Sequence, residues 1–317
     1  MKFTGFHYLS ERVSPKLGRK SIADADTKIS GRPRLNRARL EANFPRPYVS
    51  YPGIESFENS GPVRQSRGSA AIWENGLPID FYFDIHKYAP LVVVLNGAAQ
   101  PDMRLPWFAG DTVSSGMFVS RLSISDPSLY LDPSLNLAWY AGNKYQPFLH
   151  KTLARLITHV ARVSEAPKIV LLGGSGGGFA SMLIASQLKS STAIVMNPQT
   201  SIERYHPTHR QRYIDIAWEG SDKLFHKSAK ADVDSEVEAS IGEMTILYMQ
   251  NRSDTFHVKN HLAPFRESFH TAPGMWLLFE EWREGHTPPP KKVISSTLQA
   301  AIRPDSDVYQ SLGYSPL

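Results

Sequence analysis

Residues 168–188 read KIVLLGGSGGGFASMLIASQL, and this stretch decides the fold. Ile169–Leu172 is a short apolar run after a proline, which is typical of a buried parallel strand. Phe179–Leu188 carries apolar residues at helical spacing. Between the two lies Gly173-Gly174-Ser175-Gly176-Gly177, so the stretch predicts a strand, a tight glycine turn and a helix.

The glycine turn contains the pattern G-x-S-x-G, which suits a serine nucleophile. A tight strand-to-helix turn strains the backbone of Ser175, and flanking glycines avoid collisions with the strand and the helix. The helix N-terminus also favours developing negative charge. A P-loop is excluded because no Lys-Ser or Lys-Thr follows, and Phe179 stands where a dinucleotide fingerprint needs its last glycine. We therefore predict that Ser175 is a nucleophile; the alternative is a purely structural turn.

The composition indicates one large α/β domain with insertions. A chain of 317 residues with 41% hydrophobic content can bury a sizeable core. Its longest apolar runs are strand-sized, and residues 1–20 lack the apolar core of a signal peptide. The absence of cysteine excludes disulfides, thiolate metal sites and a cysteine nucleophile. We expect a cytoplasmic protein.

The positive charge is concentrated near the N-terminus. Residues 1–50 hold eleven Lys and Arg against four acidic residues, whereas the remaining chain is slightly acidic. This basic arm could bind an anionic partner, such as nucleic acid, a lipid surface or an acidic polymer. We favour the alternative, a solvated extension draped over the domain, because the arm has few aromatic residues and no nucleic-acid-binding module.

The pattern along the chain predicts two regions. Residues 1–65 form a basic, irregular N-terminal extension with a short helix near residues 35–42, and residues 66–317 form the α/β domain. Residues 200–240 are polar and partly helical, and form a small lid-like insertion. Strands alternating with helices favour a mostly parallel sheet with an antiparallel hairpin at its start. The predicted strands are 70–74, 79–84, 91–95, 117–124, 169–172, 193–196, 244–250 and 275–280; the predicted helices are 145–163, 179–188, 260–269 and one after the prolines 288–290.

A serine nucleophile needs a base, and the base needs an orienting acid. In chain order, the acid should follow a strand after the turn and the histidine should follow the last strand. Asp254 and His286 meet both conditions, and both fall at the carboxyl ends of strands, where Ser175 also lies. The alternative acids are Asp222, Glu280, Glu281 and Glu284.

His257 and His261 are four residues apart, a spacing that can hold a metal on one helical face. Val258 follows His257, however, so the glutamate of a metalloprotease helix is missing. We expect surface or capping roles for these two histidines, and predict no metal and no cofactor.

An oxyanion hole needs two backbone N–H groups aimed at one point. The amide of Gly176 is the first, and Ala98, in the loop after strand 91–95, is the second. Four residues are weaker candidates for substrate contacts, because rings and amides in loops can stack on sugars or line an acyl pocket; core packing is the alternative for the aromatic ones. They are Asn96, Trp107, Trp139 and Tyr140.

Together, the G-x-S-x-G turn, the Asn96-Gly97 loop, and the positions of Asp254 and His286 after later strands resemble the α/β-hydrolase superfamily. The resemblance extends over about residues 69–302. The resemblance implies a sheet of about eight strands with helices on both faces, and a Ser175–His286–Asp254 triad. The strings SDPSL, LAWYAG, GGSGGGFAS, NPQT and QNRSDTFH further resemble hydrolase-fold esterases and acyltransferases associated with bacterial surface glycans. We therefore expect an acyl hydrolase or acyltransferase of the esterase or O-acetyltransferase type, acting on a small-molecule or glycan ester. The alternative is a non-catalytic hydrolase-fold partner in a glycan or envelope assembly.

Overall fold

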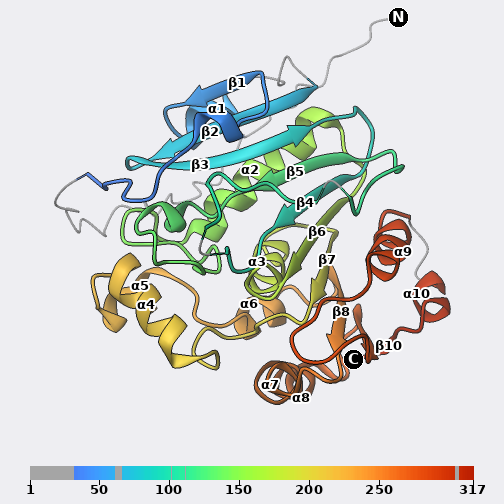
Figure 1. The fold of residues 1–317 in the computed structure, drawn as a ribbon. Coiled ribbons are helices and arrows are strands. Elements are labelled where there is room, and N and C mark those ends of the chain that lie inside the picture. The colour runs from blue at the N-terminus through green and yellow to red at the C-terminus, as the bar shows by residue number, and fades with distance from the viewer. Residues whose placement is uncertain (1–31, 61–65, 101, 111, 304–306) are drawn as a thin grey trace, which may run out of the picture. The chain divides into compact units, whose positions relative to one another are not determined.

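A mixed, mostly parallel sheet forms the centre of the computed structural model, which describes residues 32–60, 66–100, 102–110, 112–303 and 307–317 (Figure 1). The order of its ten strands is β1-β2-β3-β5-β4-β6-β7-β8-β9-β10. The six strands from β4 to β9 pair in parallel, whereas β3 is antiparallel to both β2 and β5. The strands are β1 (Tyr48–Tyr51), β2 (Arg67–Glu74), β3 (Leu77–Asp84), β4 (Leu91–Leu95), β5 (Ser120–Ile124), β6 (Ile169–Gly174), β7 (Ser191–Met196), β8 (Met244–Asn251), β9 (Met275–Glu280) and β10 (Ser315–Pro316).

Helices cover both faces of this sheet, as predicted. Strand β4 demonstrates the reason: Leu91, Val93 and Leu95 face one hydrophobic core, and Val92 and Val94 face a second. The first core includes side chains of α2 and α3, and the second includes side chains of α9 and α10. The helices are α1 (Ile54–Glu58), α2 (Leu149–Ser164), α3 (Gly176–Ala185), α4 (Pro207–Ala217), α5 (Asp222–Ser228), α6 (Asp234–Ala239), α7 (Thr255–His257), α8 (Ala263–Phe269), α9 (Lys291–Ala301) and α10 (Asp307–Ser311), with short helical turns at η1 (Glu41–Asn43), η2 (Pro127–Tyr130) and η3 (Val258–Leu262).

All eight predicted strands are present, and the two additional strands lie at the edges of the sheet. β1 comes from the region predicted to be an irregular extension, and pairs in parallel with β2. β10 is two residues long and antiparallel to β9. The insertion between β7 and β8 contains α4, α5 and α6, in agreement with its predicted partial helicity.

Residues 32–50 of the basic arm pack against the rest of the domain, and the Arg39 charge is paired rather than solvated. The Arg39 guanidinium lies 2.6 Å from the buried Asp80 carboxylate and 4.3 Å from the centre of the Phe44 ring. The predicted helix near residues 35–42 is wrong, because Arg39 forms a β-bridge with Leu105 and only η1 is helical. Residues 1–31, the first part of the arm, lie outside the described residues.

Within the described ranges, no helix is both long enough and apolar enough to span a lipid bilayer.

Candidate active site

Ser175 lies at the turn between β6 and α3, in a conformation that side chains rarely adopt. Its φ of 55° and ψ of −121° are strained, as the motif predicts. Its N–H donates to the carbonyl of Met196 over 2.9 Å, which ties the turn to β7. The flanking glycines are required by close approach: a Cβ at Gly173 would lie 2.1 Å from the Gly177 carbonyl oxygen, and one at Gly177 would lie 2.2 Å from that of Leu95.

The loop after β4 lies directly against this turn. A Cβ at Gly97 would lie 3.5 Å from the Cβ of Ser175, so the predicted donor Ala98 is one residue beyond this contact. Gly176 is the first residue of α3, and its N–H therefore has no acceptor within the helix. The two predicted oxyanion donors are thus on segments that meet at Ser175.

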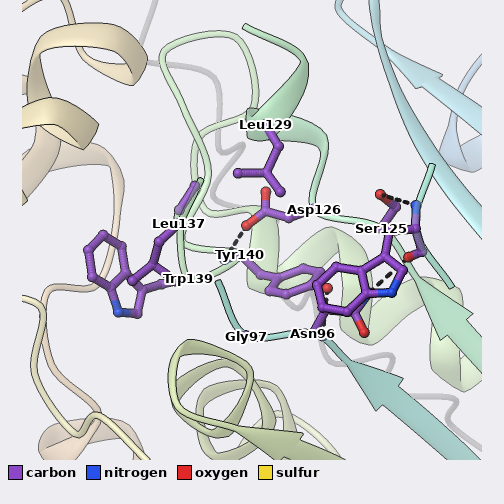
Figure 2. Close-up of a pocket in the computed structure, with 10 residues that line it drawn as sticks. Asn96, Gly97, Ser125, Asp126, Leu129, Leu137, Trp139 and Tyr140 are labelled. Carbon is purple, nitrogen blue, oxygen red and sulfur yellow. Dashed lines mark hydrogen bonds between the residues drawn. The ribbon is translucent and has the colours of Figure 1, made fainter. Parts of the chain in front are cut away.

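A small pocket opens beside Gly97 (Figure 2). The cavity has a volume of about 10 Å³. Leu137 and Trp139 line it and also abut Gly176, because a Cβ on that glycine would lie 2.5 and 3.3 Å from their side chains. The remaining lining residues include Asn96, Trp107 and Tyr140, so all four predicted substrate-contact residues surround one cavity.

The polar groups of these residues are bonded to one another within the protein. The Asn96 side chain donates to the Trp107 carbonyl over 2.8 Å, and the Asn96 N–H donates to the Tyr140 hydroxyl over 2.9 Å. Asp126 accepts the Tyr140 N–H over 2.7 Å, and burial raises its pKa to about 6. Asp126 therefore holds the backbone at Tyr140, whose φ is 52°, beside the pocket.

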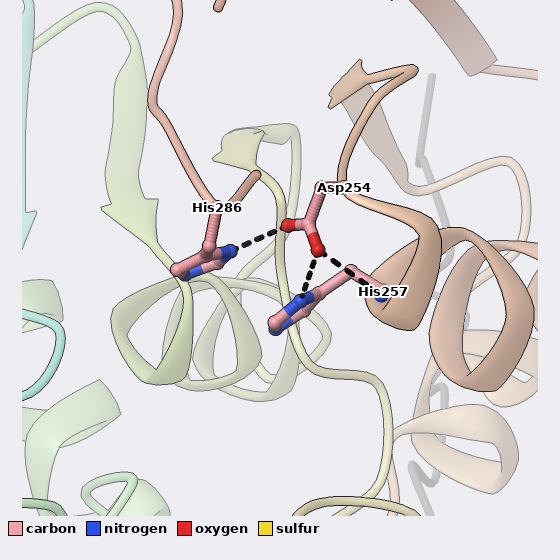
Figure 3. A group of neighbouring side chains, drawn as sticks. All are labelled: Asp254, His257 and His286. Atoms are coloured by element: carbon pink, nitrogen blue, oxygen red, sulfur yellow. Dashed lines mark hydrogen bonds and ion pairs between the residues drawn. The ribbon is translucent and has the colours of Figure 1, made fainter. Parts of the chain in front are cut away.

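Asp254 and His286 are brought together by the loops after β8 and β9 (Figure 3). The Nδ1 of His286 lies 2.5 Å from Asp254 Oδ2. Asp254 is buried, whereas the His286 side chain is 42% exposed. Burial opposes ionisation of Asp254, but hydrogen bonds from His257 and His286 outweigh it and hold its pKa below the ordinary value.

Two asparagines, for which the sequence predicted no individual role, fix the His286 loop. The Asn251 amide donates to the carbonyls of Arg283 and Gly285, over 2.6 and 2.8 Å. The Asn197 amide donates to the Thr287 carbonyl over 2.8 Å. Asn251 ends β8 and Asn197 follows β7 directly, so their position at strand ends was the available signal.

The expected surface role of His257 and His261 is wrong, because both rings are buried. His257 Nδ1 lies 3.0 Å from Asp254 Oδ1, and its ring stacks on that of His286 with centres 4.1 Å apart. One ligand atom from each of Asp254, His257 and His286 lies within 4.8 Å of the others, a spacing at which three such atoms could bind one metal ion. Each of the two imidazoles is also within hydrogen-bond distance of one oxygen of Asp254.

Among the described residues, the hydrogen-bond partner of Ser175 Oγ is Gln199, whose Nε2 lies 2.7 Å away. Gln199 follows β7, the strand next to the one that carries Ser175. The alternative acid Asp222 is exposed and forms an ion pair with Arg210.

Comparison with known proteins identifies the fold. No family model and no curated protein sequence matches this chain. The capsule O-acetyltransferase of Neisseria meningitidis serogroup A is 16% identical with a TM-score of 0.54, covering 72% of this chain and 94% of that one. The Gap123 glycosylation-associated complex of Streptococcus agalactiae is 16% identical with a TM-score of 0.56, covering 75% of this chain and 47% of that one. The fluorophosphonate-binding serine hydrolase F of Staphylococcus aureus is 9% identical with a TM-score of 0.54, covering 77% of this chain and all of that one. These similarities establish the predicted α/β-hydrolase fold.

Proposed function

We propose that this α/β-hydrolase-fold chain is a serine-dependent acyl hydrolase or acyltransferase that forms an acyl-enzyme on Ser175. The observation that carries the proposal is the 2.5 Å contact between Asp254 and His286 at the sheet edge where Ser175 occupies a strained turn. Asp254 keeps the His286 proton on Nδ1, so Nε2 is free to accept a proton.

In the proposed reaction, His286 Nε2 takes the Ser175 proton while Oγ attacks the carbonyl carbon of an ester. The N–H groups of Gly176 and Ala98 stabilise the oxyanion. The ester C–O bond then breaks, and His286 returns the proton to the departing alcohol. In the second half, water or a sugar hydroxyl attacks the acyl carbon and gives its proton to His286. The bond between that carbon and Oγ then breaks, and His286 returns the proton to Oγ.

We assign the acyl group to the small pocket beside Gly97, which Ser175 does not line but whose lining residues Gly97 and Leu137 approach Ser175 and Gly176. Its space suits little more than a methyl group without movement of Leu137 or Trp139. An acetyl ester of a small molecule, a glycan or a cell-envelope polymer is therefore the substrate class that we propose, and cytoplasmic acetyl transfer to a bacterial glycan is the finer form of the proposal.

A fluorophosphonate probe tests the nucleophile. The wild-type protein should be labelled, Ser175→Ala should not, and Ser186→Ala, which changes a serine just beyond the same helix, should be labelled normally. Equal labelling of wild type and Ser175→Ala would remove the proposal. Aryl acetate should be cleaved faster than aryl octanoate, and addition of a glycan acceptor separates transfer from hydrolysis.

A second proposal, a docking role in a glycan or envelope assembly, is supported by the similarity to the Gap123 complex and by the basic arm. Because Arg37 and Arg39 are bonded within the fold, the test is deletion of residues 1–31 rather than of the whole arm. Loss of salt-sensitive retention on heparin resin, with ester turnover unchanged, would support docking. Unchanged retention would oppose it.

A further inference from the structure

The side chain of Gln199 contacts three residues of the candidate site. It is fully buried. Its Oε1 accepts a hydrogen bond from Trp139 Nε1 over 3.0 Å, and its Nε2 lies 2.7 Å from Ser175 Oγ and 3.1 Å from His257 Nε2. An indole nitrogen can only donate, so the amide oxygen must face Trp139. Both N–H groups of the amide therefore point away, one to Ser175 and one to His257.

This orientation determines where His257 carries its proton. Its Nε2 must accept from Gln199, so the proton is on Nδ1, where it donates to Asp254 Oδ1 over 3.0 Å. A second proton on Nε2 would face the amide N–H, so the arrangement requires a neutral ring. Burial lowers the pKa of His257 as well, against the opposing attraction of Asp254.

His257 also determines which oxygen of Asp254 is available to His286. The backbone N–H of His257 lies 3.3 Å from Asp254 Oδ1, the same oxygen that its ring contacts. Oδ2 is thereby left for His286, whose ring rests on that of His257 at an interplanar angle of 16° (Figure 3). His257 therefore fixes both the carboxylate and the plane of the second imidazole.

His261, one helical turn after His257, binds the loop that contains Gln199 and Thr200. Its Nδ1 accepts the Thr200 N–H over 3.2 Å, and its own carbonyl accepts the Thr200 hydroxyl over 3.3 Å. Burial lowers the pKa of His261 to about 3, so this ring is neutral too. The spacing of the two histidines thus serves two successive residues, Gln199 and Thr200.

We infer that Gln199 is a catalytic residue of the reaction proposed above, on which this inference rests, and that His257 is its positioning residue. A hydroxyl oxygen that accepts from Gln199 directs its own proton elsewhere, where His286 can take it. The same N–H stabilises the negative charge that builds on Oγ when the proton leaves and again when Oγ departs from the acyl-enzyme. No bond beyond those of the acyl transfer is formed or broken.

Two substitutions at Gln199 separate this role from simple packing. Glu keeps the size and still accepts from Trp139, but it offers Ser175 an oxygen, to which the hydroxyl must turn its proton. We expect kcat to fall about 10²-fold in Gln199→Ala and about 10³-fold in Gln199→Glu, with little change in KM. A space-filling role predicts the reverse order, because Glu fills the site and Ala leaves a cavity. Gln187→Ala and Gln187→Glu, at an exposed glutamine, are the matched controls and should match wild type.

The positioning role of His257 is tested by a graded pair. Asn can present an N–H to Asp254 near the place of Nδ1, whereas Phe preserves only the stacking surface. His257→Asn should therefore recover part of the kcat that His257→Phe loses, at unchanged KM. Equal losses in the two variants, each with an intact melting transition, would contradict the role.

A measurement without substrate tests the network independently of the reaction. The ¹⁵N chemical shifts of His257 should report a neutral ring protonated on Nδ1 in wild type, and a doubly protonated ring in Gln199→Glu. A wild-type ring protonated on Nε2 overturns the inference whatever the activity. Absence of fluorophosphonate labelling of wild type overturns the proposed function instead, and with it the catalytic role of Gln199, while the shifts still test the contact.

Discussion

The substitution Asp254→Asn keeps the shape of the side chain but offers one accepting oxygen in place of two. Three N–H groups converge on the carboxylate: two from His257 on Oδ1, at 3.0 and 3.3 Å, and one from His286 on Oδ2, at 2.5 Å. If the amide oxygen stays with the two groups of His257, the amide NH₂ faces His286. The His286 proton must then move from Nδ1 to Nε2, the atom that we propose as the acceptor of the Ser175 proton.

The expected loss in kcat is about 10⁴-fold, the size of the same substitution in a serine-protease triad, where it also leaves the wrong tautomer. This corresponds to about 5 kcal/mol of transition-state stabilisation. Folding should suffer far less, because Asn caps the N-terminus of α7 as well as Asp does and remains hydrogen-bonded. We expect the free energy of unfolding to change by about 2 kcal/mol or less.

The assay is kcat/KM for an aryl acetate together with the rate constant of fluorophosphonate labelling. Asp215→Asn, at an exposed aspartate on α4, is the matched control and should behave as wild type. Urea denaturation checks that Asp254→Asn remains folded. A folded Asp254→Asn protein that loses less than about tenfold in both rates would refute the assignment of Asp254 as the orienting acid.

Three further predictions concern stability. Burial raises the pKa of Asp254, but hydrogen bonds from both histidines outweigh it, so the folded-state pKa is lower than the unfolded one. The ionised carboxylate therefore stabilises the fold fully above about pH 4, and this contribution is lost as the pH falls. The urea midpoint should drop more between about pH 5 and pH 3 in wild type than in Asp254→Asn. Gly177→Ala should destabilise by at least about 3 kcal/mol in urea denaturation, because its Cβ would lie 2.2 Å from the Leu95 carbonyl; Gly53→Ala, whose nearest contact would be 3.6 Å, should cost far less. Arg39→Met leaves the Asp80 carboxylate buried without its cation and should cost about 3–5 kcal/mol by the same measurement, whereas exposed Arg46→Met should cost little.

The strands were predictable because their signal is local. LVVVL at 91–95 and MWLLFE at 275–280 are apolar runs whose observed bounds equal the predicted ones. β1 was missed because Tyr48–Tyr51 is short and follows a basic, proline-containing stretch, and its place depends on pairing with β2. The net charge of residues 1–50 was misleading for a similar reason, because it does not reveal that Arg39 pairs with Asp80, forty-one residues along the chain.

The site was predictable only in part. Topology places Ser175, Asp254 and His286 in chain order at strand ends, so the fold rule alone selects them. Gln199 lies in the string NPQT, but its role could not be predicted, because its partners Trp139 and His257 are 60 and 58 residues away. The pair His257 and His261 was visible, but helical spacing cannot distinguish a metal site from two rings that hold a loop.

The sheet order explains why Gln199 and His257 are needed between Ser175 and Asp254. Ser175, Gln199, Asp254 and His286 follow β6, β7, β8 and β9, four adjacent strands. Adjacent strands are about 4.8 Å apart, so the ends of β6 and β9 are separated by about 14 Å, beyond the reach of a serine and a histidine side chain alone. The loop after β9 must therefore come back across the edge, and its bonds to Asn251 at the end of β8 and to Asn197 after β7 mark that course. Gln199 and His257 occupy the space between, which is why a polar network rather than apolar packing connects the proposed nucleophile Ser175 to the proposed acid Asp254.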